Sequence, residues 1–290
     1  MNRFLALAAF VSLLPWGAIA SPLGPEGTPG QYLPGKFVWF DLATEDPAAA
    51  RAFYGAVFGW SFRDVAEAPG SYTLIANDSG KVGGLLRHAR PAGAMVGARW
   101  LALISVPDVA GAAQLARERG GSVVTEPHPV AGRGTLAVLR DPQGAVFGVL
   151  KADGGDPPDT PVEQGDVFWL DLFTADPAQA AAFYAALGGY DVDVGEVAGR
   201  PRTLLSNHGI ARAGIARIEP SKTRPQWLPY ILVDDVPATL DRVRRAGGRV
   251  VLPPRAGLLE GNVAVIADPQ GGTLGIVRWS SEVPAPGAAR

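Results

Sequence analysis

Apolar and polar positions in the first half of the chain alternate first with the period of a strand and then with that of a helix. The strand pattern covers 37–43, and Asp46-Pro47 follows it. An Asp side chain accepts the free backbone N–H groups that open a helix, and Pro suits the first helical position. Apolar residues through Val57 then form one helical face, and Gly59 ends the helix. The first predicted unit is therefore a strand followed by a short amphipathic helix.

The same unit recurs later in this half of the chain. Strands are predicted at 71–77 and 81–86, after which a new strand and helix begin. The remaining predicted elements are a strand at 101–106, a helix at 108–119, and strands near 122–124, 136–140 and 145–150. The order of strand, helix and several strands thus occurs twice, which predicts an α+β domain made of two similar modules.

Three long segments of the first half return in the second half in the same order. In the first pair, 37–60 and 167–190, roughly half of the aligned positions are identical. The other matching pairs are 99–124 with 226–251 and 139–151 with 266–278. This regular offset indicates duplication of a whole domain. We expect one domain at 36–151 and a second at 166–280, which can pair within the chain.

Stretches rich in Pro, Gly or Ala flank the two predicted domains. Such composition is typical of loops and linkers, because Gly and Pro favour turns over regular elements. We interpret 21–35 as a flexible lead-in, 152–165 as an interdomain linker and 281–290 as a disordered tail.

The N-terminus has the three-part pattern of a secretory signal peptide. A short basic start is followed by an apolar run at 4–14, and Ala18-Ile19-Ala20 places small residues before Ser21. The apolar run is too short to span a bilayer comfortably. We therefore expect a secreted or periplasmic protein with no membrane anchor once the signal is removed.

Composition narrows the chemistry and the partners. The chain has no cysteine, which excludes disulfides, a catalytic thiol and a lipid anchor at the cleavage site. Its formal net charge is −2, and it has no basic stripe, so nucleic acid is not an expected partner. The apolar fraction of 47% is that of a globular protein with its own core.

An ordered set of motifs, present twice, resembles the vicinal oxygen chelate superfamily of glyoxalases, bleomycin-resistance proteins and dioxygenases. Each copy begins with a strand and D-P-A-x-A-x-A-F-Y, continues to G-[WY] and ends on D-P-Q-G-x-x-[FL]-G; the first copy also has Gly-Gly-Leu at 83–85. The set covers nearly all of 36–280. The resemblance implies that two βαβββ modules in each domain form a cupped, half-open barrel around a small-molecule site.

The resemblance also gives the positions at which metal-dependent members place His or Glu ligands. In this sequence the first position falls on Trp39 and Trp169, seven residues before the Asp that begins each helix. The other positions fall near Leu101 and Leu228, and on Gly148 and Gly275. Divalent metals in proteins need imidazole, carboxylate or thiolate ligands. We therefore expect no metal and no cofactor, unlike the metal-dependent members of the superfamily.

The three histidines do not replace these missing ligands. His88 follows a predicted strand, His128 is placed in a loop between prolines, and His208 adjoins a Gly turn. They share no helical or strand spacing, so we expect them to be solvated or structural.

Strand alternation predicts which side chains enter each cup. If Trp39 points inward, so does Asp41, and in the second copy Trp169 and Asp171 do the same. In the first copy Phe37 and Ala43 share the inward face, and the residues that pack against the helix are Val38, Phe40 and Leu42. Each cup then presents a Trp ring and an unpaired Asp, which attracts a cation or a hydroxyl donor. Alternatively, each Asp makes a duplicated structural hydrogen bond and the Trp rings fill the cavity.

Other candidate ligand contacts lie on the opening and closing strands of the second module in each domain. Residues at alternate positions of a strand share one face, and a Gly leaves room for a ligand. These candidates are Leu101, Ser105 and Gly148 in the first domain, and Leu228, Tyr230 and Gly275 in the second.

Three functions fit this sequence. The favoured one is an exported, metal-independent protein that binds an apolar or cationic small molecule in a cup. The second is a glyoxalase-like lyase or isomerase in which Asp41 or Asp171 acts as a general base. The third is an interaction module whose cups are filled by its own side chains. Binding is favoured over catalysis, because no group that could polarise a substrate is evident near either Asp.

Export can be tested directly on the mature protein. We expect residues 1–20 to be absent, because their pattern is that of a cleaved signal peptide. N-terminal sequencing of secreted or periplasmic material should begin at Ser21. A mature chain that begins at Met1 would contradict this prediction.

Overall fold

The computed structural model describes most of the chain between the predicted signal peptide and the predicted tail. The described residues are 23–65, 72–88, 97–197, 200–219 and 223–279. The predicted signal at 1–20 and the predicted tail at 281–290 lie outside them. No helix in this part of the chain is long and apolar enough to cross a membrane.

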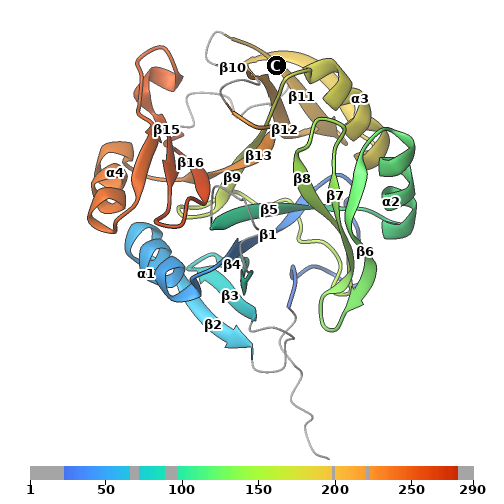
Figure 1. Cartoon of the computed structure of the whole chain (residues 1–290), viewed down its shortest axis with the longest axis horizontal. Coiled ribbons are helices and arrows are strands. Elements are labelled where there is room, and N and C mark those ends of the chain that lie inside the picture. The colour runs from blue at the N-terminus through green and yellow to red at the C-terminus, as the bar shows by residue number, and fades with distance from the viewer. Residues whose placement is uncertain (1–22, 66–71, 89–96, 198–199, 220–222, 280–290) are drawn as a thin grey trace, which may run out of the picture.

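Two eight-stranded sheets, one from each half of the chain, form the framework (Figure 1). The first sheet has the strand order β2-β3-β4-β1-β5-β8-β7-β6. The elements of this half are β1 (Phe37–Thr44), α1 (Pro47–Phe58), β2 (Ser61–Val65), β3 (Tyr72–Asn77), β4 (Gly80–Arg87), β5 (Ala98–Ser105), α2 (Val109–Glu118), β6 (Ser122–Val130), β7 (Gly134–Arg140) and β8 (Val146–Ala152).

The second sheet repeats this plan with the strand order β10-β11-β12-β9-β13-β16-β15-β14. Its half of the chain contains β9 (Val167–Thr174), α3 (Pro177–Gly188), β10 (Asp191–Val197), β11 (Arg200–Asn207), β12 (Ile210–Arg217), β13 (Gln226–Leu232), α4 (Val236–Arg245), β14 (Arg249–Leu252), the short 3-10 helix η1 (Leu259–Gly261), β15 (Val263–Ala267) and β16 (Thr273–Val277).

Each sheet consists of two βαβββ modules joined at its centre. β1 pairs antiparallel with β5, whereas β1 with β4, and β5 with β8, pair in parallel within the modules. β9, β12, β13 and β16 repeat these pairings in the second sheet. The predicted α+β architecture of two tandem domains, each built from two βαβββ modules, is confirmed.

The first helix begins and ends at the predicted signals. The Asp46 side chain accepts the N–H of Ala49, and Gly59 ends α1 with a φ of 74°. β2 had no counterpart among the strands predicted from the hydrophobic pattern. It lies at the edge of its sheet and has no buried residue, so its sequence carries little hydrophobic signal.

A β-bulge in β1 changes the predicted order of its side chains. The register with β5 shifts between Phe37 and Trp39. Val38 and Trp39 both lie in the cluster beneath the first cup, whereas Phe37 lies in the core on the opposite face. The expectations for Phe37 and Val38 were therefore wrong, because an extra residue in a bulge breaks strict alternation. Phe40 and Leu42 pack in the core as predicted.

β6 is longer than predicted and includes His128, which the sequence analysis placed in a loop. Its pairing with β7 shifts register twice. β6 is the last strand of its sheet, and an edge strand tolerates residues such as Pro127 and Pro129 that lack an N–H for the ladder. The extra length carries His128 to the first cup.

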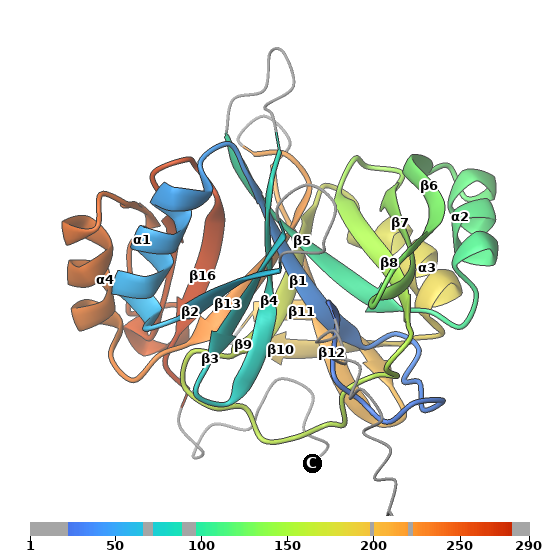
Figure 2. The ribbon, with the colours of Figure 1, turned by 90° about the horizontal axis from the view of Figure 1, so that it is seen from below.

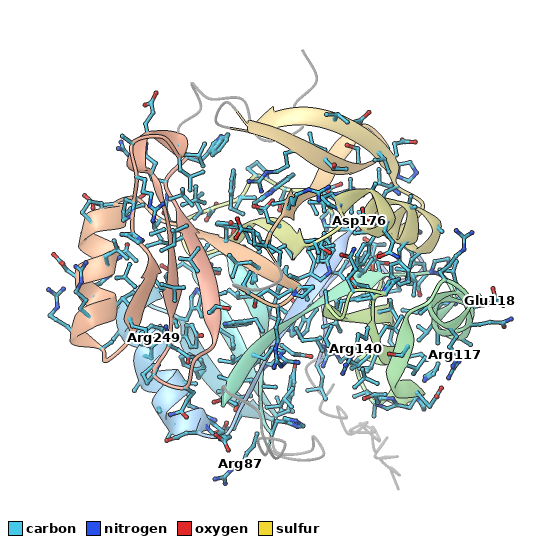
Figure 3. The ribbon with its side chains drawn as sticks, turned by 45° about the horizontal axis from the view of Figure 1, so that its top comes forward. Arg87, Arg117, Glu118, Arg140, Asp176 and Arg249 are labelled. Carbon is cyan, nitrogen blue, oxygen red and sulfur yellow. The ribbon has the colours of Figure 1, made fainter. Side chains whose placement is uncertain are left out.

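One continuous core joins the two domains. α1 lies beside α4 at one end of the molecule, and α2 lies beside α3 at the other (Figures 1 and 2). Phe37 of β1 meets Trp227 of β13 with ring centroids 5.0 Å apart. One face of each sheet contributes to this shared core, and a separate cluster lies beneath each cup. Exposed charges such as Arg117 and Glu118 of α2 point outward (Figure 3).

Within the shared core, a tyrosine of the first domain bonds to an aspartate of the second. The Tyr54 hydroxyl on α1 donates to Asp268 at 2.9 Å and accepts from the Trp100 indole N–H at 2.9 Å. Burial, reinforced by the Asp268 charge, raises the pKa of Tyr54 well above its usual value. The hydroxyl therefore keeps its proton and remains a donor.

The reverse contact repeats this arrangement. The Tyr184 hydroxyl on α3 donates to Asp141 at 3.2 Å and accepts from Trp227 at 2.9 Å. Asp141 also accepts two backbone N–H bonds in its own D-P-Q-G turn, as Asp268 does in the second copy. The F-Y and D-P-Q-G motifs of each domain therefore hold the other domain in place.

The lead-in and the linker pack against the first domain. Leu23 lies in the cluster beneath the first cup, and its N–H donates to the Gly132 carbonyl at 2.8 Å. Asp156 of the linker accepts the N–H of Leu33 at 2.6 Å and the Ser105 hydroxyl. From Leu23 onward a buried apolar side chain and a buried carboxylate anchor the lead-in against the first domain.

The Tyr–Asp contacts between the domains predict a measurable stability effect. Tyr54→Phe and Tyr184→Phe each leave a Trp N–H and an Asp oxygen buried without their partner. We expect each variant to lose about 1–3 kcal/mol of unfolding free energy in urea melts. The control is Tyr32→Phe, since the Tyr32 hydroxyl has no partner among the described residues. Equal stability of all three variants and the wild type would contradict the prediction.

Candidate functional site

The concave face of the first sheet encloses a cavity of about 400 Å³. Strands of both modules contribute to its walls, which are mainly apolar. Its lining includes Ala43 of β1, Leu86 of β4, Leu101 and Leu103 of β5, Leu136 and Val138 of β7, and Gly148 of β8. Asp41 and Arg133 are the buried charged residues among the lining residues.

A hydrogen-bonded network surrounds Asp41 in this cup. One carboxylate oxygen accepts the Trp39 indole N–H at 3.0 Å and the Tyr72 hydroxyl at 2.6 Å. The other oxygen accepts a hydrogen bond from Nη2 of Arg133 at 2.5 Å. Both side chains of this ion pair are only 6% exposed. Asp41 is therefore not the unpaired acid that strand alternation suggested, because a cation from another part of the chain neutralises it.

Arg133 comes from the tight turn between β6 and β7. Gly132 and Gly134 flank it with φ values of 72° and 122°, a region that favours glycine. The guanidinium lies 5.7 Å from the centroid of the Trp39 ring and 5.5 Å from that of Tyr72, within cation–π range. Sequence analysis missed Arg133; the Gly-Arg-Gly turn is the local signal that could have drawn attention to it.

Electrostatics keep this network in one protonation state. Burial opposes the charge on Arg133, but the charge of Asp41 outweighs that penalty and raises the pKa of the guanidinium. Burial, then the Asp41 charge, raises the pKa of Tyr72 well above its usual value. Arg133 is therefore charged and Tyr72 is a neutral donor at physiological pH.

The Gly-Gly-Leu motif makes space for the network. Gly84 of β4 stands opposite Asp41 of β1, and a Cβ atom there would lie 1.8 Å from the Tyr72 hydroxyl oxygen. Gly214 occupies the same place beside Asp171 in the second sheet, where a Cβ would lie 2.4 Å from the carboxylate. A side chain at either position would displace a member of the network.

Three cationic or titratable side chains also line the first cavity. His88 and Arg99 are exposed and flank residues 89–96, which lie outside the described part of the chain. His128 is half-buried on β6, with Nδ1 2.8 Å from the Glu126 carbonyl oxygen. The sequence spacing gave no sign that two of the three histidines meet at one cavity, since they come from opposite halves of the cup.

The second cup contains the same residue types from different strands. Asp171, which is buried, forms an ion pair with the partly buried Arg202 of β11 and accepts the Trp169 indole N–H at 3.1 Å. Burial, then the Asp171 charge, raises the pKa of the Tyr230 hydroxyl of β13 well above its usual value. A Cβ on Gly275 would lie 2.0 Å from the Tyr230 ring, so that ring already fills the space that Gly275 was expected to leave for a ligand.

The chain matches known sequence families over both halves. Residues 36–149 match the Glyoxalase/Bleomycin resistance protein/Dioxygenase superfamily, and residues 168–277 match a Glyoxalase-like domain. The chain belongs to this superfamily. The resemblance seen in the paired sequence motifs is therefore confirmed.

Relatives within the superfamily extend over nearly the whole chain. CFP32 of Mycobacterium tuberculosis, whose name assigns it provisionally to the glyoxylases, is 30% identical and covers 86% of this chain and 96% of its own. The anthracycline biosynthesis protein DnrV of Streptomyces peucetius is 29% identical and covers 88% of this chain and 97% of its own.

Solved structures of the superfamily share the fold. The Mn(II)-bound glyoxalase from Novosphingobium aromaticivorans has a TM-score of 0.56 at 16% identity, covering 85% of this chain and 83% of its own. An extradiol ring-cleaving dioxygenase from B. fuscum has a TM-score of 0.57 at 16% identity, covering 92% and 77%.

The positions that resemble superfamily metal ligands carry no suitable donors here. Trp39 stands opposite Leu103, and Leu103 stands beside Gly148, so an indole, an alkyl group and a bare backbone occupy this row. Leu101 stands opposite Asp41, whose oxygens already accept three donors. Among the described residues, no three His, Cys, Asp or Glu side chains come together as a metal site would require. These residues do not fit a divalent metal.

The structure separates the other predicted ligand contacts into those at the first cavity and those elsewhere. Asp41, Leu101 and Gly148 line the cavity. Trp39 is a buried donor within the network, and Ser105 bonds to Asp156 of the linker instead of facing the cup. The candidates of the second domain form a cluster of their own around the second cup: Trp169, Leu228 and Tyr230.

The buried ion pair of the first cup predicts a strong non-additive effect on stability. Asp41→Asn leaves Arg133 charged and unpaired in a buried site, which costs about 3–5 kcal/mol of unfolding free energy. The double variant Asp41→Asn/Arg133→Gln removes both charges and should recover most of that loss. Urea unfolding of both variants and the wild type measures the coupling. An Asp41→Asn variant as stable as the wild type would show that the pair does not form.

Proposed function

We propose that this protein is an exported, metal-independent binding protein that holds a small organic molecule in its first cup. The observation that carries the proposal is the cavity of about 400 Å³ beside a buried and incompletely bonded Arg133. Small-molecule sites typically have volumes of about 300–1,000 Å³ and mainly apolar walls with a few polar groups. The first cup has both features.

The state of Asp41 favours binding over catalysis by that residue. A general base needs a free lone pair within reach of the substrate proton. Here Trp39, Tyr72 and Arg133 all donate to the Asp41 carboxylate, so about three of its four acceptor positions are taken and a substrate proton would have to compete with these donors. Asp171 has the corresponding Trp and Arg partners in the second cup. The alternative of an Asp-based lyase or isomerase is therefore the weaker of the two.

The relatives point to ring compounds as a ligand class. DnrV and DauV, both from Streptomyces, are named for the biosynthesis of anthracyclines. The apolar walls of the first cup, with polar groups at one side, suit a ring system that carries oxygen substituents. Export rests on the N-terminal signal pattern alone.

Occlusion of the cavity tests the site. Val124 is half exposed at the first cavity, and Val251 occupies the matching position on β14. We expect Val124→Trp to weaken binding of N-phenyl-1-naphthylamine, a neutral fluorescent probe, by about tenfold or more, or about 1.4 kcal/mol. Val251→Trp is the matched control and should bind the probe as the wild type does.

The same titration tests metal independence. Binding of the probe should be unchanged after dialysis against excess EDTA, because no described residue cluster supplies metal ligands. If the wild type does not bind the probe, or if both tryptophan variants bind it equally, the first cup is not the site. Loss of binding in EDTA would overturn the metal-free proposal.

A further inference from the structure

We propose that the first cup selects ligands that carry an anionic oxygen, a carboxylate or an acidic phenol, and anchors that oxygen on the Arg133 guanidinium. This inference rests on the proposed function, and it names the class of ligand. It replaces the apolar or cationic ligand that the sequence suggested.

The first observation is an unused hydrogen-bond donor. Arg133 is 6% exposed; its Nε–H is fully buried without a partner, and its Nη1 group has no partner among the described residues and is not fully buried. Nη2 of Arg133 donates to Asp41, and Arg133 lines the cavity. A guanidinium has five N–H donors in one plane, which suits two parallel bonds to a carboxylate. Because Nη1 is unbonded and Arg133 lines the cavity, an acidic oxygen of a ligand can accept a hydrogen bond from Nη1.

The second observation is that Asp41, the only acid among the described residues of the cavity wall, already accepts three protein donors. Both Asp41 oxygens accept protein donors, and its charge is balanced by Arg133. A cationic ligand would have to compete with a buried guanidinium for this carboxylate. An anionic ligand needs no such exchange, because it meets donors that the protein leaves free.

The third observation is the sign of the charge around the cavity. With Asp41 and Arg133 balanced, Arg99 leaves the described charged residues of the lining with one net positive charge. Such a field favours the approach of anions. The positive groups therefore agree with the free donor.

The second cup lacks the equivalent of Arg133. Alignment of Gly134 with Gly261 places the exposed Glu260 at that position, so the charge there is reversed. The counter-ion of Asp171 is instead Arg202, which comes from the strand that corresponds to the one carrying Tyr72. The described geometry thus assigns the anion preference to the first cup, and the second cup offers a matched control.

Competition between isosteric probes tests the inference. N-phenyl-1-naphthylamine bound to the full mature protein is displaced with 2-naphthoate, with its neutral analogue 2-naphthamide, or with the cation 2-naphthylmethylammonium. We expect naphthoate to bind about tenfold to a hundredfold more tightly than naphthamide, as for one charge-assisted hydrogen bond, and the cation to bind most weakly.

Paired variants identify the anchor. In Asp41→Asn/Arg133→Gln, which removes both charges together, the ratio of naphthamide to naphthoate dissociation constants should fall to near one. In Asp171→Asn/Arg202→Gln the wild-type ratio should persist. Arg133→Lys keeps the charge but loses the fork, and it should give an intermediate ratio.

The outcomes separate this inference from the proposed function. If N-phenyl-1-naphthylamine binds but naphthoate and naphthamide compete equally, the anion preference is wrong and the binding site stands. A preference that survives in Asp41→Asn/Arg133→Gln, or disappears in Asp171→Asn/Arg202→Gln, shows that Arg133 is not the anchor. If no probe binds at all, the proposed function fails.

Discussion

A buried tyrosine hydroxyl that donates to a buried aspartate of the other domain holds the two halves of this molecule together. Tyr54 with Asp268 and Tyr184 with Asp141 form this contact twice, and a Trp N–H completes each chain. In a low-dielectric core a missing partner is costly, so these contacts fix how the domains pair. Because one face of each sheet is used for pairing, the opposite faces are left to form the two cups.

The same physical rule, that a buried carboxylate needs a donor and a cation, shapes the cups. Duplication kept the Trp–Asp pair in both domains, but the counter-ion comes from a turn in the first cup and from β11 in the second. A buried carboxylate needs a cation nearby, but any part of the chain can supply that cation. The two cups could therefore diverge in shape and charge while each kept its network satisfied.

The position of the counter-ion decides what each cup can offer a ligand. Arg133 approaches Asp41 from the end of an edge hairpin, lines the cavity and donates only Nη2 to the carboxylate. In the second cup the Tyr230 ring lies over Gly275, and Arg202 reaches Asp171 from within the sheet. Similar residue types thus place a hydrogen-bond donor at the cavity of the first cup and fill the centre of the second cup with a side chain.

The sequence by itself determined the duplicated α+β fold, because capping residues such as Asp46 and turn glycines such as Gly59 are local signals with local causes. Its resemblance to the superfamily implied that the positions of the metal ligands carry no metal-binding side chains here. Only the tertiary structure showed that Asp41 is paired with Arg133 and that His128 lies at the first cavity. Sequence reasoning relied on strict alternation along each strand, which a β-bulge interrupts in β1 and register shifts interrupt in the long edge strand β6. The partner of Asp41 lies 92 residues away along the chain, and no periodic pattern encodes a contact of that separation.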